Sequence, residues 1–314
     1  MACMTEMERQ KTMTPYKIII DTDAGDDVDD ILCVALALQS PEVEVLGITT
    51  VYKNTAARAR MVRYLLKHTG FDHIPVFAGI GTPLLPRSPV DLQAIPSGYI
   101  PAMDALDIRQ DMGAVEFIIE TVRKYPGEVT LVAVGELTNL AVAFRQAPDI
   151  VPKIRRIYMM SGAFFCHMVE WNVLCDAQAS VEVYRAAVEK YAVGSDVTIQ
   201  CALTPEETER ILRHGSPWTD VLAHYIRAFK ASWPQKDVIP HDPLALASVF
   251  APDFLRFVPA KIEICLEKGI FFGFTLNRSR YDYYRPVDKT PNCQCACEVD
   301  RKGFVDFLME RLCR

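Results

Sequence analysis

Short apolar runs alternate with amphipathic stretches along the first two thirds of the chain, and this alternation constrains the fold more than any other feature. The apolar runs with the character of buried or extended strands lie at residues 17–21, 42–49, 75–78, 129–134 and 154–160. The amphipathic stretches that fit helices lie at residues 28–39, 55–68, 113–125, 137–146 and 177–189. Strand–helix alternation of this kind predicts an α/β fold, with an open, mostly parallel sheet that is flanked by helices on both faces.

The last third of the chain is more helical. We expect helices at residues 205–214, 218–232 and 242–250, strand-rich stretches at 261–266 and 292–299, and a closing helix at 302–312. No internal repeat, low-complexity linker or charge block divides the chain, and open α/β folds often run this long as one unit. The sequence therefore predicts a flexible N-terminal segment over residues 1–15 and a single domain over residues 16–314, with helical insertions in its C-terminal third.

Charge and hydropathy narrow the class of partner. The formal net charge is −6, so nothing in the charge balance favours nucleic acid. The residues before Tyr16 lack the apolar core of about 7–15 residues that a signal peptide needs. No stretch approaches the roughly 18 apolar residues of a membrane span. We therefore expect a cytoplasmic protein with no membrane partner, and a mildly acidic chain suits small-molecule chemistry or cation binding.

Three of the ten cysteines form a cluster, Cys293, Cys295 and Cys297. Their spacing of two would place all three on one face of a strand. A buried strand face is the favoured interpretation, and a zinc or redox site is the alternative. The proline-rich segment 84–101 is the least regular part of the chain and predicts a long surface loop. This loop is either a functional lid or a rigid surface loop.

The strongest local signal is an acidic loop after the first expected strand. Six aspartates fall within the ten residues from Asp21 to Asp30. Carboxylates gathered in this number repel one another, and a bound cation offsets that repulsion directly. Their oxygens suit Ca²⁺ or Mg²⁺, and ligands of open parallel sheets bind at the carboxyl ends of strands, where this loop lies. A run of solvated aspartates that cap the next helix explains only one or two of them.

A strand that ends in Asp-x-Asp, followed by a glycine loop and an Asp-Asp pair that opens a helix, is similar to the signature of the nucleoside hydrolase family. The stretch here is longer by two residues than the usual form, so Asp29 and Asp30 take the place of the terminal pair. The roles of Asp26 and Asp27 stay open. Ala24 stands where the family usually has proline.

Further motifs of the family follow in the same order over nearly the whole chain. They are the segments 49–54 (TTVYKN), 135–141 (GELTNLA), 159–163 (MMSGA), 170–176 (EWNVLCD) and 241–245 (HDPLA). Lys53 and Glu136 depart from the glycine and proline that are usual at their positions. Glu170 and Asn172, two residues apart, are expected to face one side of an extended segment.

The resemblance implies calcium-dependent hydrolysis of the N-glycosidic bond of a ribonucleoside by a metal-oriented water. It implies that Ca²⁺ is held by Asp23, Asp30, Asp242 and the carbonyl of Thr138, and that Asp23 takes the proton of the water. The residues it implies for the sugar are Asp29, Asn54, Met160, Glu170 and Asn172. Several of these assignments have ordinary structural alternatives. Asn54 and Asp242 could be helix caps, and Met160 could be a core residue. The remaining alternative is that Glu170 and Asn172 are polar surface residues.

The residue that assists the leaving base is less defined. In some family members a histidine at the position of His241 protonates the base, although a structural histidine is almost as well supported by the sequence. The histidine that the family often carries in the loop after the third strand has no counterpart in residues 84–101. Aromatic residues could stack on the base, among them Trp171 and Trp233.

Other interpretations of the chain are a non-catalytic metal- or sugar-binding relative, and a family member with a specialised substrate. A phosphatase of the haloacid dehalogenase type also begins with a strand and Asp-x-Asp, but it leaves most of the motifs above without a role. By resemblance the small-molecule partner is a nucleoside or another ribosyl compound, and the assembly is a homodimer or homotetramer.

Overall fold

The computed structural model describes residues 14–279 and 288–314. Most of the expected N-terminal segment, residues 1–13, lies outside this range. Eight strands form one sheet in the order β3-β2-β1-β4-β5-β6-β10-β7. Their bounds are β1 Tyr16–Thr22, β2 Val43–Thr50, β3 Val76–Ala78, β4 Val129–Ala133, β5 Arg156–Met160, β6 Lys190–Val193, β7 Leu255–Ala260 and β10 Cys293–Val299.

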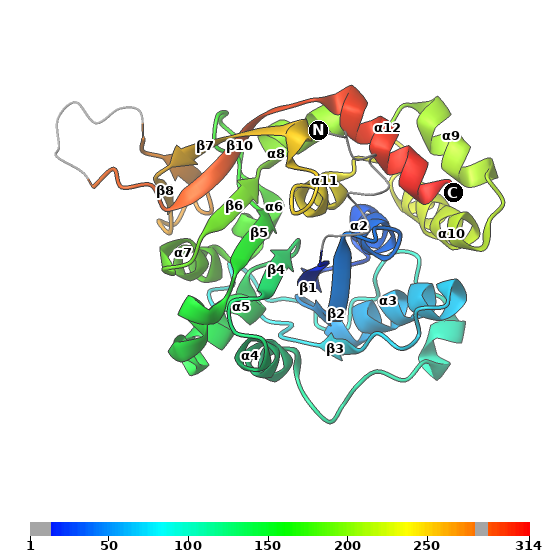
Figure 1. Cartoon of the computed structure of the whole chain (residues 1–314), viewed down its shortest axis with the longest axis horizontal. Helices are drawn as coiled ribbons and strands as arrows, with labels where there is room; N and C mark the ends of the chain where they lie inside the picture. The colour runs from blue at the N-terminus through cyan, green and yellow to red at the C-terminus, as the bar shows by residue number, and fades with distance from the viewer. Residues whose placement is uncertain (1–13, 280–287) are drawn as a thin grey trace, which may run out of the picture.

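All neighbouring strands of this sheet are parallel except β10 and β7, which pair antiparallel at one edge. A separate hairpin of β8 (Ile262–Ile264) and β9 (Thr275–Asn277) lies beside that edge (Figure 1). The expected open, mostly parallel sheet is therefore confirmed. Because the carboxyl ends of parallel strands meet along one edge, the loops after β1, β2, β4 and β5 are brought together.

Helices cover both faces of the sheet (Figure 1). One hydrophobic cluster packs α4 (Ala114–Lys124), α5 (Thr138–Gln146) and α7 (Ala177–Arg185) against one face. The other cluster contains α2 (Asp29–Leu38), α3 (Thr55–Thr69), α10 (Pro217–Ser232), α11 (His241–Ala247) and α12 (Arg301–Leu312). The shorter or peripheral helices are α6 (Trp171–Cys175), α8 (Ser195–Thr198) and α9 (Pro205–Arg213). No helix within the described ranges is long and apolar enough to cross a membrane.

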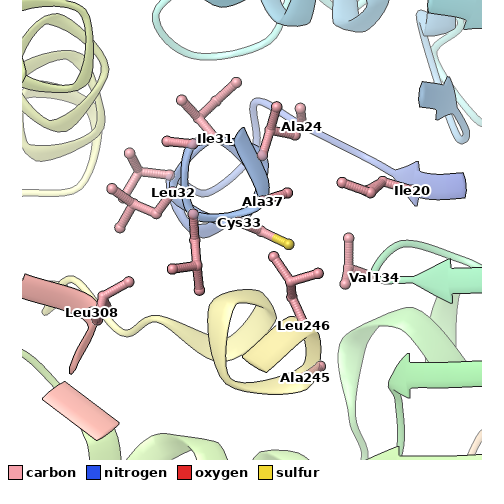
Figure 2. Close-up of a cluster of buried hydrophobic side chains, with 14 of the residues drawn as sticks. Ile20, Ala24, Ile31, Leu32, Cys33, Ala37, Val134, Ala245, Leu246 and Leu308 are labelled. Carbon is pink, nitrogen blue, oxygen red and sulfur yellow. The ribbon is translucent and has the colours of Figure 1, made fainter. Parts of the chain in front are cut away.

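Helix α2 is buried along most of its length. Every residue from Asp29 to Ala37 is buried, which fits a helix whose sequence, DDILCVALAL, is apolar on all sides after its first two residues. Figure 2 shows Cys33 of α2 beside Leu246 of α11, with Ile31 on the other side of α2; Leu308 of α12 belongs to the same cluster. This packing fixes the start of α2 against the start of α11, and both starts carry aspartates.

Three expectations about the elements were wrong in detail. The helix expected over 177–189 ends at Arg185, and β6 follows it, because four strand residues behind a helical run leave too little pattern to detect. The strands β7, of six residues that include Pro259, and β9, of three residues, were also missed. Glu170 and Asn172 do not share an extended segment: Glu170 caps α6, and Asn172 lies inside that helix.

The cysteine cluster lies on a strand, as expected, but only two of its members share the buried face. Cys293 and Cys295 are buried, whereas Cys297 is partly exposed. The pairing of β10 with β7 shifts register between Ala296 and Glu298, so Cys297 occupies a bulge and leaves the face of the other two.

The proline-rich segment 84–101 packs against the acidic loop. The Ser97 amide donates to the Gly25 carbonyl at 2.8 Å. Gly25 adopts a φ of +122°, and a Cβ there would lie 2.2 Å from the Pro96 Cβ. This close approach requires glycine at position 25. The segment therefore forms one wall above the acidic loop, and its role as a lid stays a prediction.

Candidate active site

A cavity of about 690 Å³ opens at the carboxyl ends of the central strands. Its size is typical of a small-molecule site. Loops that follow β1, β2, β3 and β5 line it together with the starts of α2 and α11 and the end of α10. Eight residues predicted for the site are in its lining: Asp23, Asp29, Asp30, Met160, Glu170, Asn172, His241 and Asp242.

Three carboxylates meet at the base of this cavity. Asp29 and Asp30 form the first turn of α2, and Asp242 is in the first turn of α11. One carboxylate oxygen from each lies within 4.8 Å of the other two, and all three residues are buried. The set is close to the predicted metal site, although Asp29 rather than Asp23 is the third member of this tightest group.

Burial and mutual repulsion raise the pKa of Asp29, Asp30 and Asp242 well above the ordinary value for aspartate. Burial also raises the pKa of Asp23 to about 6, while Arg58 opposes that rise. Buried carboxylates at this separation are costly when all are ionised. An all-oxygen donor set of this kind fits a hard divalent cation such as Ca²⁺, whose charge would offset the repulsion.

Thr138 is not placed where the sequence predicted it. It lies in the first turn of α5, and its hydroxyl donates to Asp176 at 2.7 Å. It is not among the described residues that line the cavity. Val134, which directly follows β4, does line the cavity, and its carbonyl accepts a hydrogen bond of 2.8 Å from the Asn172 amide. The sequence interpretation missed Val134 because any residue can offer a main-chain carbonyl, whatever its side chain.

Asn54 also lies outside the lining that the described residues form. It is the N-cap of α3, and its side-chain oxygen accepts from the Ala57 amide at 3.1 Å. The structure therefore supports the helix-cap alternative for Asn54 in the ligand-free protein.

Glu170 and Asn172 are held firmly at the β5 side of the cavity. The Glu170 carboxylate accepts from the amides of Gly162 at 2.9 Å, Asn172 at 2.7 Å and Val173 at 3.0 Å. The side-chain amide of Asn172 donates to two main-chain carbonyls, that of Met160 at 3.1 Å and that of Val134 at 2.8 Å. Burial raises the pKa of Glu170 to about 7. Both side chains are thus fixed in position to receive hydroxyl groups of a ligand.

His241 lines the cavity at the start of α11. Its Nδ1 lies 2.5 Å from the hydroxyl oxygen of Thr198. Burial lowers the pKa of the imidazole to about 4. The ring is therefore neutral at pH 7 in the ligand-free protein, which weakens the case for His241 as the donor of a proton to a leaving group.

Lys53, Asp26 and Arg58 form a network that the sequence interpretation missed. The Asp26 carboxylate accepts from Lys53 at 2.8 Å and from Arg58 at 3.0 Å. Arg58 is 1% exposed and also donates to the carbonyls of Asp23, Ala24 and Tyr52. Asp26 therefore belongs to an ion-pair network beside the carboxylate cluster, a role that only tertiary contacts reveal.

A buried glutamate, Glu136, adjoins the same network. It is 0% exposed, and neither carboxylate oxygen has a hydrogen-bond partner among the described residues. Burial raises its pKa well above the ordinary value, and the nearby Asp23 adds to the rise. Burial thus favours the neutral form of Glu136, and the charge of Arg58 opposes that effect.

Asn139 links three strand ends underneath the site. Its amide donates to Asp21 at 2.8 Å and to the Thr50 carbonyl at 3.1 Å, and its oxygen accepts from the Ile80 amide at 3.0 Å. Asp21, at the end of β1, has its other carboxylate oxygen unpaired among the described residues. Asn139 is therefore a structural residue that ties α5 to the ends of β1, β2 and β3.

We expect the Asn139→Ala variant to lower the free energy of unfolding by about 3 kcal/mol, because it leaves buried polar groups without partners. Urea denaturation followed by circular dichroism measures the change. The Asn54→Ala variant, which loses one helix cap, should cost only about 1 kcal/mol. Equal losses in the two variants would contradict the role assigned to Asn139.

Comparisons with known proteins agree with this architecture. The sequence profile described as "Inosine-uridine preferring nucleoside hydrolase" matches residues 18–306. The pyrimidine-specific ribonucleoside hydrolase RihA of Citrobacter koseri is 30% identical, over 94% of this chain and 97% of its own. The solved structure of the plant nucleoside hydrolase PpNRh1 is 29% identical with a TM-score of 0.82, over 95% of this chain and 99% of that one. A purine-preferring ribonucleoside hydrolase from Gardnerella vaginalis is 28% identical with a TM-score of 0.78, over 95% and 98%. The similarity spans every element that lines the cavity.

Proposed function

Because the chain belongs to the inosine-uridine preferring nucleoside hydrolase family, we propose that it hydrolyses ribonucleosides to free base and ribose in a calcium-dependent reaction. The observation that carries the proposal is the group of buried carboxylates of Asp29, Asp30 and Asp242 beside Asp23, inside a cavity at the carboxyl ends of the strands. The family match, which covers this whole region, supports the same reaction class.

We assign the calcium ligands to Asp23, Asp30 and Asp242, with Asp29 adjoining them. A bound Ca²⁺ supplies positive charge that offsets carboxylate repulsion, and it makes a coordinated water more acidic. Thr138 was also predicted as a ligand through its carbonyl, and its position outside the cavity speaks against that role. The Val134 carbonyl, which does line the cavity, is the better candidate.

The side chains of the cavity suit the two tasks of N-glycoside hydrolysis. A pKa of about 6 leaves Asp23 ionised at neutral pH, so its carboxylate can accept the proton of the attacking water. Glu170, Asn172 and Asp29 can hold sugar hydroxyls by hydrogen bonds, which fixes the ring beside the water. Carboxylates close to the ring also stabilise positive charge that develops on the sugar.

The base would lie between aromatic side chains at the rim. Trp171 and Trp233 line the cavity, and about half of each side chain is exposed. Large exposed aromatics at a cavity rim are suited to stack on a heterocycle. The relative RihA is named for pyrimidines and the Gardnerella structure for purines, so both base classes belong in the test.

Incubation of the purified protein with uridine, cytidine, inosine and adenosine, followed by an assay of released reducing sugar, tests this function. We expect release that depends on added Ca²⁺ and stops when a chelator is added. Release that is unchanged by the chelator would contradict the calcium assignment. No release from any nucleoside by folded protein would contradict the hydrolase function.

Two further features are proposed from the family alone. We expect a homodimer or homotetramer, which analytical ultracentrifugation would detect, and a cytoplasmic location, which cell fractionation would detect.

A further inference from the structure

We propose that Lys53 is the catalytic residue that protonates the departing base, and that Asp26 and Arg58 are the positioning residues that aim it. The proposal rests on the hydrolase function above and supplies a leaving-group donor for it. Three observations carry it: the backbone at Lys53, its ion pair and its place in the cavity.

The backbone around Lys53 adopts the left-handed conformation, with positive φ, that residues other than glycine rarely adopt. Tyr52 has a φ of 66° and Lys53 a φ of 55°. Such a conformation is strained for a residue with a side chain, and glycine would relieve the strain. Hydrogen bonds of 2.8 Å from the Tyr52 amide to the Ile80 carbonyl and from the Lys53 amide to the Gly81 carbonyl hold the turn. A lysine at such a position is explained by its side chain, which lines the cavity.

Lys53 and Arg58 share one ion-pair partner, but their side chains differ in burial. Lys53 and Arg58 both donate to one carboxylate, that of Asp26. Arg58 is anchored to three main-chain carbonyls and is buried, whereas the Lys53 side chain is 25% exposed to the cavity. Since two cations share one carboxylate, Asp26 orients the Lys53 ammonium without using up its capacity to donate to a ligand.

The order of the strands places Lys53 on the side where the base would lie. The sheet runs β2-β1-β4-β5, with Lys53 after β2, Asp23 after β1, and Glu170 and Asn172 beyond β5. If Glu170 and Asn172 hold the sugar with its reacting carbon next to Asp23, the bond to the base would point toward β2. Ile95 and Ser97 of segment 84–101 line this same side.

Other cationic groups fit the role less well. His241 begins α11 next to Asp242, and its Nδ1 lies 2.5 Å from the Thr198 hydroxyl oxygen. The Lys236 ammonium lies 4.3 Å from the centre of the Trp233 ring, closer than the 5.2 Å between the Lys53 ammonium and the Tyr52 ring, and Lys236 follows α10 rather than β2. Lys53 is thus a cation that lines the cavity on the β2 side and is held in place there by Asp26.

The step balances as a hydrolysis. Water oxygen bonds to C1′ of the ribose while its proton passes to Asp23. The C1′–N bond breaks, and its electron pair stays on the base nitrogen, which takes a proton from the Lys53 ammonium. Asp23 then releases its proton to solvent and Lys53 regains one from solvent, so the net reaction consumes one water.

Two substrates separate this role from others: uridine, whose base must be protonated or stabilised as it leaves, and 4-nitrophenyl β-D-ribofuranoside, whose nitrophenolate leaves without protonation. We expect Lys53→Met to lower kcat for uridine by about 10²–10⁴-fold, while kcat for the nitrophenyl riboside changes by only a few-fold. Asp26→Asn should show the same pattern with a smaller loss. Lys53→Gly should match Lys53→Met in activity and melt at an equal or higher temperature, because glycine relieves the backbone.

Lys17→Met is the matched control, because it removes a lysine–carboxylate pair of similar geometry (2.7 Å to Glu128) at the opposite end of β1. It should leave both activities unchanged. Parallel losses on both substrates in the Lys53 variants, or no loss on either, would overturn the role of Lys53. A wild-type protein that cleaves neither substrate would overturn the hydrolase function itself.

Discussion

We expect the Asp30→Asn variant to fold, to lose calcium binding and to hydrolyse nucleosides at least about 10³-fold more slowly than the wild type. Asparagine keeps the shape of the side chain and can still accept the hydrogen bond that the Thr22 hydroxyl donates to Asp30. The substitution removes one negative charge from the cluster of Asp29, Asp30 and Asp242. The loss should therefore appear in kcat/KM and in calcium affinity rather than in the fold.

Stability distinguishes this loss from misfolding. Burial and the neighbouring Asp23 raise the pKa of Asp30 well above its ordinary value, so its ionised form destabilises the calcium-free fold. The Asp30→Asn variant should then melt at a higher temperature than the wild type in chelator at about pH 8. Asp149→Asn, which alters an exposed aspartate paired with Arg123 and Lys153, serves as the control and should keep full activity. An Asp30→Asn enzyme that retains calcium-dependent turnover would contradict the metal assignment.

The fold could be predicted from the sequence where a pattern depends on local residues alone. Buried parallel strands read as continuous apolar runs, and those at 17–21 and 129–134 correspond closely to β1 and β4. The run Lys190–Val193 was missed because four residues carry too little periodicity, and its pairing with β5 supplies what the sequence lacks.

The candidate site could be predicted where charge itself was the signal. Six aspartates in ten residues require an explanation, and the structure brings Asp29 and Asp30 together with the distant Asp242. Val134 could not be found, because a main-chain carbonyl is the same in every residue. Nothing in the sequence connects Lys53 and Arg58 with Asp26, and only the fold places both against it.

Calcium should reduce the loss of stability that the protein undergoes as the pH rises. Burial raises the pKa of Asp23 to about 6 and those of Asp21 and Glu170 to about 7, whereas in the unfolded chain such groups ionise near pH 4. The folded state therefore favours their neutral forms. The stability that these groups contribute is fully present below about pH 4 and is lost as the pH rises through 6 to 7. For Asp23 alone, a pKa raised from 3.8 to about 6 corresponds to about 3 kcal/mol.

We accordingly expect the calcium-free protein to melt at a lower temperature at about pH 8 than at about pH 5.5. Added Ca²⁺ should raise the melting temperature more at the higher pH, because it binds the ionised carboxylates and competes with protons for them. Differential scanning calorimetry with chelator or with Ca²⁺ at both pH values measures the four temperatures. In Asp30→Asn the calcium effect should vanish and the pH dependence should become shallower. A calcium-free protein that gains stability between these pH values would mean that the buried carboxylates are already compensated by the chain's own cations, Arg58 foremost, and that the cavity does not need a metal ion to hold their charge.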